Sequence, residues 1–328
     1  MKIGVVGCGA LGSYYGAKLC RDGQETHFLL RSDYECVRAL GLRVRSVEGN
    51  FHVNPRCARA PEEIGVCDLV LIGLKTTANG EFAKLLPPLV GENTAVVTLQ
   101  NGLGNEAPLA DLFGAKKILG GLCFVCLNRV EPGVIHHLAH GTIVLGEYER
   151  WPEARTHDLA SMIRRAGVPC KVTDNLERAH WEKLVWNIPF NGLGVASAAG
   201  YEALTAPPSA LRVPRSTGPC LGTDQLLADP RWEQLVRELM LEVIAAANAL
   251  GFKISESLAA RQIERTRTMG AYKASTLIDF ERGQPLELES MFLEPLRRAE
   301  KTGVATPRLA ALGAVLKELD PATAPVSA

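Results

Sequence analysis

The stretch KIGVVGCGALG, residues 2–12, decides the fold. Residues 2–6 are short, largely apolar and rich in valine, which is the pattern of a buried strand. A G-x-G-x-x-G motif follows at once, then residues 10–20 carry apolar side chains at helical spacing, and residues 25–30 have the pattern of a second strand. A strand before this motif and a helix after it favour a dinucleotide-binding βαβ unit over an ordinary glycine-rich turn.

Each glycine of the motif has its own task in such a unit. Gly7 allows the tight turn, Gly9 lets a pyrophosphate approach the backbone, and Gly12 lets the helix pack closely on the strand. The phosphates are expected at the N–H groups and positive dipole end of the helix. The predicted cofactor-binding residues of this turn are Gly7, Cys8, Gly9, Ala10, Leu11 and Gly12.

The end of the second predicted strand indicates which nicotinamide cofactor binds. NAD-binding units usually place Asp or Glu there to hold the ribose 2′-hydroxyl, whereas this sequence has Leu29-Leu30-Arg31-Ser32. A guanidinium pairs with a 2′-phosphate, and a carboxylate would repel it. Arg31 therefore predicts NADPH, the alternative being a solvated surface arginine.

Length and composition limit the class of protein. A chain of 328 residues with 47% apolar residues is long enough for two domains with separate cores. Its formal net charge of zero gives no electrostatic reason to bind nucleic acid or an anionic membrane. No apolar run is long enough to span a bilayer, and the first strand leaves no room for a signal peptide. We therefore expect a soluble, cytoplasmic protein.

The cysteines and histidines do not predict a metal site. The nine cysteines are scattered and odd in number, which suits reduced thiols in a cytosol. Cys123 and Cys126 form a C-x-x-C in a predicted strand, where residues three apart face opposite sides. His136, His137 and His140 lie beside glycines with no convincing carboxylate or thiolate partner near them.

Further strand patterns alternate with helical ones as far as residue 173. They predict a Rossmann-type, doubly wound, mostly parallel sheet over residues 1–173, followed by an all-α domain over residues 174–328. Lys75 follows the predicted strand 68–74, and Asn101 follows the predicted strand 94–99. Because strand ends in such sheets face the ligand crevice, Lys75 is a candidate contact to the cofactor or the substrate, and Asn101 is a candidate contact to the nicotinamide ribose or carboxamide. The alternatives are a lysine in solvent and a simple Asn-Gly turn.

The second half of the sequence is helical in pattern. Helices are expected over residues 176–187, 231–250, 257–280 and 289–302, together with a short earlier one over 81–89. Residues 205–230 are rich in Pro, Gly and Ser, and we interpret them as a functional lid or a partly mobile segment. The Ala/Pro/Ser-rich tail after Pro321 is expected to fray.

One row of polar residues in this half is a candidate for chemistry. Lys183, Asn187 and Asn191 are spaced i, i+4, i+8, so on a helix they share one face. Pro189 is expected to kink that helix. Amine and amide groups on an otherwise apolar helix are costly to bury unpaired, which favours a functional row over a solvated polar stripe.

These features together resemble the ketopantoate reductase (2-dehydropantoate 2-reductase) family nearly from end to end. The resemblance rests on the glycine turn, Arg31, Lys75, Asn101-Gly102, the Lys183–Asn187–Asn191 helix and the later run Ser275, Asp279, Gly283, Leu286-Glu287-Leu288-Glu289. It implies reduction of a 2-oxo acid by NADPH, with 2-dehydropantoate becoming pantoate in pantothenate and coenzyme A synthesis.

The resemblance also implies roles for residues. Lys183 corresponds to the general acid, and Glu287 to the carboxylate that holds the lysine and the substrate hydroxyl. Substrate binding is implied for Asn187, Asn191 and Ser275, and a place at the cofactor–substrate junction for Lys75 and Asn101. A homodimer is expected from the family alone.

The sequence departs from the family pattern at Tyr201 and Tyr272, where asparagines are expected. Both positions are candidates for the substrate pocket, so another, bulkier 2-oxo acid stays open as the substrate. A β-hydroxyacid dehydrogenase-like enzyme is a further alternative, and a non-catalytic NADPH-binding regulator is a third. Retention of both Lys183 and Glu287 favours an enzyme.

Overall fold

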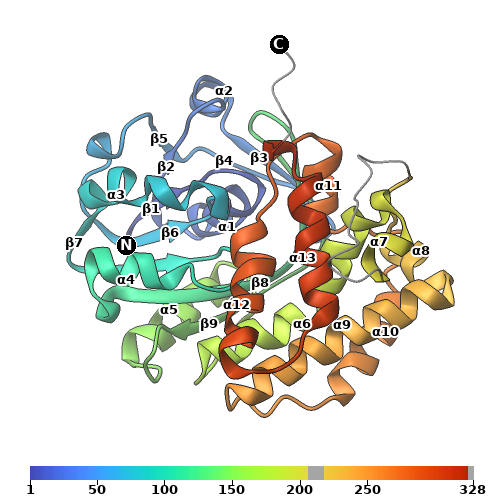
Figure 1. The fold of residues 1–328 in the computed structure, drawn as a ribbon. Coiled ribbons are helices and arrows are strands. Elements are labelled where there is room, and N and C mark those ends of the chain that lie inside the picture. Colours follow the sequence, from blue (N-terminus) through green and yellow to red (C-terminus); the bar gives the residue numbers. More distant parts are fainter. Residues whose placement is uncertain (206–217, 324–328) are drawn as a thin grey trace. The chain divides into compact units, whose positions relative to one another are not determined.

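The computed structural model describes residues 1–205 and 218–323. These divide into two compact units, Met1–Ala179 and His180–Ala328, with the division inside helix α6. In Figure 1 the first unit is the blue-to-green part of the ribbon, which holds the strands, and the second is the yellow-to-red helical part. The expected boundary at residue 173 stays a prediction.

The first unit is built on one mixed sheet, drawn in Figure 1. The strand order is β4-β3-β9-β8-β7-β6-β1-β2-β5, with β10 beside β9. The run from β5 through β8 is parallel, whereas the pairs β8·β9 and β3·β4 are antiparallel. The strands are β1 Lys2–Val6, β2 Glu25–Leu29, β3 Leu42–Ser46, β4 Phe51–Val53, β5 Arg56–Ala58, β6 Cys67–Ile72, β7 Val90–Thr98, β8 Ile118–Glu131, β9 Val134–Glu147 and β10 Cys170–Val172.

Both faces of the central strands are buried, as a doubly wound sheet requires. Val5 belongs to one apolar cluster and its neighbour Val6 to another, and the same alternation separates Leu71 from Ile72. Successive side chains of a strand point to opposite faces, so the two clusters are the cores on the two faces. The predicted fold class is therefore confirmed.

Helices and short helical turns cover this sheet. The α-helices are α1 Ala10–Arg21, α2 Tyr34–Leu40, α3 Phe82–Leu85, α4 Glu106–Phe113 and α5 Ala154–Arg165, and the 3₁₀ turns are η1 Pro61–Glu63, η2 Thr76–Glu81, η3 Pro87–Leu89 and η4 Ala115–Lys117. The helix predicted over 81–89 is wrong in length, because α3 ends at Leu85 and Pro87 has no N–H group with which to continue its hydrogen bonds.

The second unit is helical, as expected. Its elements are α6 Leu176–Ala196, η5 Ser197–Ala199, α7 Tyr201–Thr205, α8 Thr223–Ala228, α9 Pro230–Ala249, α10 Ser257–Arg267, α11 Ser275–Glu281, the π-helix η7 Glu289–Leu293, α12 Glu294–Thr302, α13 Pro307–Leu319 and η8 Pro321–Thr323. Helix α6 runs through Pro189 as a single element.

Three predictions for this unit need correction or fall outside the described residues. The helix predicted over 257–280 is two helices, because the chain turns between them at Gly270 with φ +66°. The segment 205–230 is not irregular throughout, since α8 lies within it. The lid or mobile interpretation of residues 206–217, and the fraying of 324–328, lie outside the described residues.

Candidate active site

The glycine turn after β1 has the geometry that a dinucleotide needs. A Cβ on Gly7, where φ is +90°, would lie 2.2 Å from the backbone nitrogen of Leu74, and one on Gly12 would lie 2.3 Å from the carbonyl oxygen of Gly7. A Cβ on Gly9 would meet no described atom within 4 Å. Close packing therefore requires glycine at positions 7 and 12, whereas Gly9 leaves open space beside the start of α1.

The start of α1 suits an anion. Gly9 is the N-cap, with the amide of Ser13 donating to its carbonyl oxygen at 3.1 Å. The first turn of the helix, all of which is described, carries no acidic residue. The positive end of the helix dipole is therefore not offset by a side-chain carboxylate in that turn. These residues fit the pyrophosphate of a dinucleotide.

Sheet topology brings the glycine turn and three further predicted cofactor residues to one edge. Strands β2, β1, β6 and β7 are consecutive and parallel, so their carboxyl ends meet at the same edge of the sheet. Arg31 follows β2, the glycine turn follows β1, Lys75 follows β6 and Asn101 follows β7. Arg31 and Lys75 are exposed and Asn101 is half-buried. Residues far apart in sequence thus share one rim.

An amide network that sequence reasoning missed orders two of these loops. The side chain of Gln100 accepts a hydrogen bond from Thr98 at 2.8 Å and donates to Asn79 at 2.7 Å. Asn79 in turn donates to Asn105 at 3.0 Å, and Asn105 donates to the carbonyl oxygen of Asn101 at 2.9 Å. The network joins the segment after Lys75 to the segment of Asn101. The signal in the sequence is three amides just beyond two strand ends.

In the second unit, α6 carries the predicted polar row. Lys183 is half-buried, whereas Asn187 and Asn191 are buried, at 7% and 2% exposed. The solvated-stripe alternative is therefore wrong for the two asparagines. Buried amides need polar partners, and Asn191 has two of them at the start of α11.

Asn191 and Ser275 are brought into hydrogen-bond contact. The Oδ1 atom of Asn191 accepts hydrogen bonds from the hydroxyl of Ser275 at 3.2 Å and from the amide of Thr276 at 3.0 Å. Glu287 is 5% exposed and directly precedes the π-helix η7, with its carbonyl oxygen accepting from the amide of Met291 at 3.3 Å. π-Helical turns frequently accompany functional sites.

The two tyrosines that depart from the family pattern both lie against aromatic neighbours. The ring of Tyr272 is 6.2 Å from that of Trp186, which precedes Asn187 on α6. The ring of Tyr201 packs edge-on against Trp232 at 5.4 Å and lies under the guanidinium of Arg231. Tyr272 therefore lies against Trp186, the neighbour of Asn187 in the chain, whereas Tyr201 packs against the start of α9.

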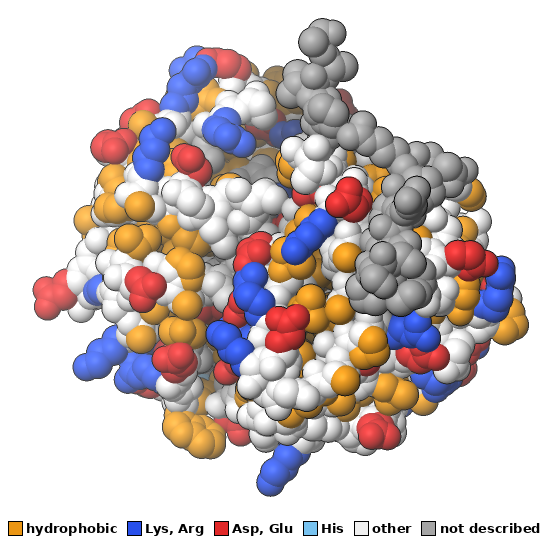
Figure 2. All heavy atoms as spheres, in the orientation of Figure 1, with side chains coloured by type: hydrophobic (Ala, Val, Ile, Leu, Met, Phe, Trp, Pro, Cys, Tyr) orange, Lys and Arg blue, Asp and Glu red, His pale blue; other side chains and the backbone are white. Residues whose placement is uncertain are grey.

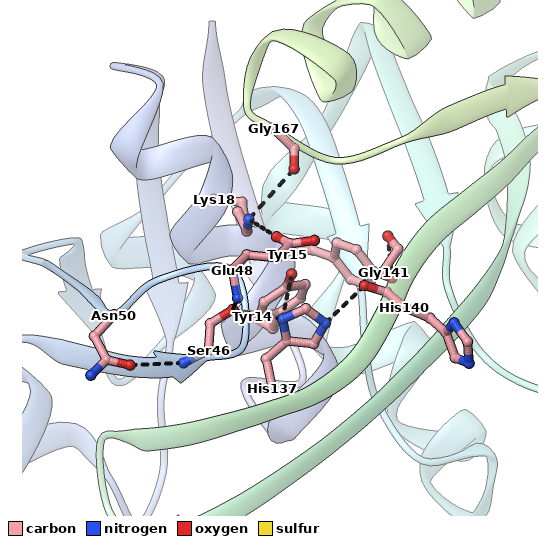
Figure 3. Close-up of polar contacts among 10 residues, drawn as sticks. All are labelled: Tyr14, Tyr15, Lys18, Ser46, Glu48, Asn50, His137, His140, Gly141 and Gly167. Carbon is pink, nitrogen blue, oxygen red and sulfur yellow. Dashed lines mark hydrogen bonds and ion pairs between the residues drawn. The ribbon is translucent and has the colours of Figure 1, made fainter. Parts of the chain in front are cut away.

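His137 takes part in a structural network, shown in Figure 3. Its Nε2 atom donates to the carbonyl oxygen of His140 at 2.9 Å, since a carbonyl can only accept. Its Nδ1 atom lies 2.8 Å from the hydroxyl of Ser46 and 3.2 Å from that of Tyr14. The ring of His140 points away from this group (Figure 3). Among the described residues no cluster of three His, Cys, Asp or Glu could hold a metal ion.

Family models match both units. Residues 3–150 match the model described as ketopantoate reductase PanE/ApbA, and residues 220–320 match that of the ketopantoate reductase PanE/ApbA C terminal. A 2-dehydropantoate 2-reductase of Nostoc sp. is 39% identical over 97% of this chain and 95% of its own length. The chain belongs to the ketopantoate reductase family. The resemblance inferred from the sequence is confirmed, and so is the prediction of an oxidoreductase acting on a CH–OH group.

Solved ketopantoate reductase structures share the whole fold. That of 2-dehydropantoate 2-reductase from Geobacter metallireducens is 47% identical, with a TM-score of 0.88, covering 97% of this chain and 99% of that one. The enzyme from Methylococcus capsulatus is 33% identical, with a TM-score of 0.84, over 97% and 96%. Membership of the family implies a nicotinamide cofactor and a small-molecule substrate.

The surface adds two observations. On the face drawn in Figure 2, acidic and basic side chains are interspersed among hydrophobic ones, in keeping with the net charge of zero. In the parts of the chain that the structure describes, no helix has both the length and the apolar character to cross a membrane.

Proposed function

We propose that this chain reduces 2-dehydropantoate to pantoate with NADPH, a step of pantothenate and coenzyme A synthesis. The observation that carries the proposal is the alignment of Arg31, the glycine turn, Lys75 and Asn101 along one sheet edge, in a chain whose relatives are named 2-dehydropantoate 2-reductase. When bound, the cofactor supplies hydride to the carbonyl carbon of the substrate.

The residues of the chain supply the rest of the chemistry. Lys183 donates the proton that the carbonyl oxygen needs as it becomes an alkoxide, and its charge stabilises that oxygen before the proton moves. Glu287 holds the ammonium of Lys183 and the substrate hydroxyl. Asn187, Asn191 and Ser275 bind the polar groups of the substrate, which fixes the carbonyl for attack.

The cofactor half of the proposal depends on Arg31. Its place just after β2 and its guanidinium group assign it to the 2′-phosphate, which distinguishes NADPH from NADH. Arg31→Ala should weaken NADPH binding far more than NADH binding, measured by quenching of intrinsic fluorescence. Equal losses for the two cofactors would contradict the assignment.

A second candidate substrate is a 2-oxo acid with a bulkier or aromatic side chain. The specific observation that favours it is the contact between the rings of Tyr272 and Trp186, 6.2 Å apart, with Trp186 next to Asn187 in the chain. An apolar wall next to the amides would suit a larger acyl group.

One experiment separates these candidates. The protein is mixed with NADPH and each of a panel of 2-oxo acids, including 2-dehydropantoate and phenylglyoxylate, and the loss of NADPH absorbance is followed. The highest kcat/KM with 2-dehydropantoate supports the first proposal, and turnover of the aromatic acid alone supports the second. Binding of NADPH without any turnover would refute both.

The catalytic role of Lys183 has its own test. Lys183→Ala should lower kcat by about 10²–10⁴-fold, the usual contribution of a general acid, and leave the Kd for NADPH nearly unchanged. The exposed Lys301, on α12, supplies the matched control Lys301→Ala, which should keep full activity. Size-exclusion chromatography with light scattering tests the expected homodimer, and cell fractionation tests the cytoplasmic location.

A further inference from the structure

Asp33 is a buried carboxylate beside the predicted 2′-phosphate residue. It lies two positions after Arg31 and is 4% exposed, whereas Arg31 and Ser32 are exposed. As the N-cap of α2 it accepts the amide of Val37 with its carbonyl oxygen, but its side chain does not cap the helix. The carboxylate turns instead toward the β8–β9 hairpin.

Arg129 reaches that carboxylate from the far end of β8. Its Nη1 atom lies 2.5 Å from Asp33 Oδ1 and 3.5 Å from the hydroxyl of Ser32. The amide of Gly133, in the hairpin turn, donates to Asp33 Oδ2 at 3.2 Å, and the hydroxyl of Ser32 donates to Oδ1 at 2.9 Å. The side chain of Arg129 is still 42% exposed. A residue ninety-six positions away thus completes the turn after β2.

The net charge of the turn after β2 depends on the ion pair between Asp33 and Arg129. Arg31 and Asp33 together carry no net charge, so without Arg129 the turn has no excess positive charge to attract a 2′-phosphate. Adding Arg129 makes the group positive. The neighbouring acid Glu35 is likewise paired, with Arg59 and Arg38.

The field of Asp33 extends to the glycine turn. Burial raises the pKa of the Cys8 thiol, and the nearby Cys57 and Asp33 raise it further. Cys8 lies between the first two glycines of the motif, so an unneutralised Asp33 would act on the phosphate-binding turn as well as on the ribose end.

We propose that Arg129 is a specificity-determining residue for the cofactor: by neutralising Asp33 it makes the turn after β2 accept a 2′-phosphate. This inference rests on the NADPH preference proposed above. In nucleotide-binding units a carboxylate near this position usually selects NAD, because it holds the 2′-hydroxyl and repels the phosphate. Here the carboxylate of Asp33 is present, and the positive charge of Arg129 compensates its negative charge.

The test measures binding of 2′,5′-ADP and 5′-ADP, which differ only in the 2′-phosphate, by calorimetry of the intact protein. Arg129→Gln should weaken 2′,5′-ADP by about tenfold or more, the order expected for an unscreened charge near a phosphate, and leave 5′-ADP nearly unchanged. The loss should shrink at high salt. Asp33→Asn in the same chain should restore most of the lost 2′,5′-ADP affinity, since no charge then needs neutralising.

Arg45→Gln is the matched control. Arg45 is an exposed arginine that pairs with Glu131 at the end of the same strand, β8, at 4.0 Å. The Arg45→Gln substitution removes an equal charge from the same unit and should leave the preference for 2′,5′-ADP intact.

The following outcomes would overturn the inference. Equal loss of both ligands in Arg129→Gln would mean that the arginine only holds the hairpin in place. Failure of Asp33→Asn to restore the preference would mean that Asp33 is not its target. If Arg129→Gln does not fold, the Asp33→Asn/Arg129→Gln protein decides alone, and it must keep most of the wild-type preference. A wild-type protein without preference would overturn the proposed NADPH specificity and this inference together, whereas a preference kept by Arg129→Gln overturns only the inference.

Discussion

The side-chain oxygen of Asn191 accepts a hydrogen bond from the hydroxyl of Ser275 at 3.2 Å. The same oxygen accepts a hydrogen bond from the amide of Thr276 at 3.0 Å. The N-cap residue of α11, Ala274, has no side-chain acceptor for that amide. The side chain of Asn191 therefore caps the first turn of α11, a helix that is distant in sequence. A residue implied in substrate binding also fixes the position of a second one.

Asn191→Ala should lower the free energy of unfolding by about 1–2 kcal/mol, the usual effect of losing a helix N-cap in a buried setting. Urea denaturation measures the loss. Asn191→Asp keeps both acceptor contacts and should fall between the alanine variant and wild type. An unchanged denaturation midpoint for Asn191→Ala would contradict the capping role.

The glycine turn offers two substitutions with opposite expectations. Gly12→Ala should destabilise the protein, because its Cβ would lie 2.3 Å from the carbonyl oxygen of Gly7 and the backbone must move. Gly9→Ala should leave the melting temperature nearly unchanged and weaken NADPH binding, because its Cβ occupies open space that the pyrophosphate needs. Thermal melts and fluorescence titrations on both variants check this. Full NADPH affinity in Gly9→Ala would show that the open space is not the phosphate site.

Lys18 is a buried cation that forms an ion pair with one carboxylate, that of Glu48. Its ammonium is 2.8 Å from Glu48 and 3.4 Å from the carbonyl oxygen of Gly167, and its side chain is 4% exposed. Both contacts are drawn in Figure 3. Glu48→Gln should lower the free energy of unfolding by about 1–2 kcal/mol. This is less than for a fully buried pair, because the side chain of Glu48 is 42% exposed.

The control for this pair is Glu281→Gln. Glu281 pairs with the exposed Lys273 at 2.7 Å, with side chains 40% and 54% exposed. Exposed ion pairs contribute little, so its unfolding free energy should stay within about 0.5 kcal/mol of wild type. Equal costs for Glu48→Gln and Glu281→Gln would contradict the importance of burial at Lys18.

Glu242 should make stability fall as pH rises above 4.5. Its oxygens accept the amides of Arg308 and Leu309 at the start of α13, yet burial raises its pKa above the usual 4.5. The folded state then holds this proton more tightly than the unfolded state, so its contribution is present below 4.5 and is lost as pH passes through the raised pKa. The free energy of unfolding of wild type relative to Glu242→Gln should therefore decline over that window. A difference in unfolding free energy that stays constant or grows with pH would contradict the raised pKa of Glu242.

The local parts of the fold followed from the sequence. The strand, turn and helix of residues 2–21 are set by neighbours in the chain, since valine runs, glycine spacing and helical periodicity act within a few residues. The same holds for the face shared by Asn187 and Asn191, and their burial indicates that the row is more than a solvated stripe.

Contacts between distant segments could not be predicted in this way. Nothing in the sequence near Asn191 indicates that α11 needs its oxygen, and nothing near Asp33 indicates that Arg129 will neutralise it. The amides of Gln100, Asn79 and Asn105 likewise have meaning only as one network.

By itself, the sequence determined the nucleotide-binding βαβ unit, the helical second half and the residues from which the chemistry is proposed, because these depend on local spacing and residue type. Only the tertiary structure decided which polar groups meet. A buried donor or acceptor must be satisfied by whatever the fold places within about 3 Å of it, and that partner is set by strand order and helix packing rather than by position in the chain.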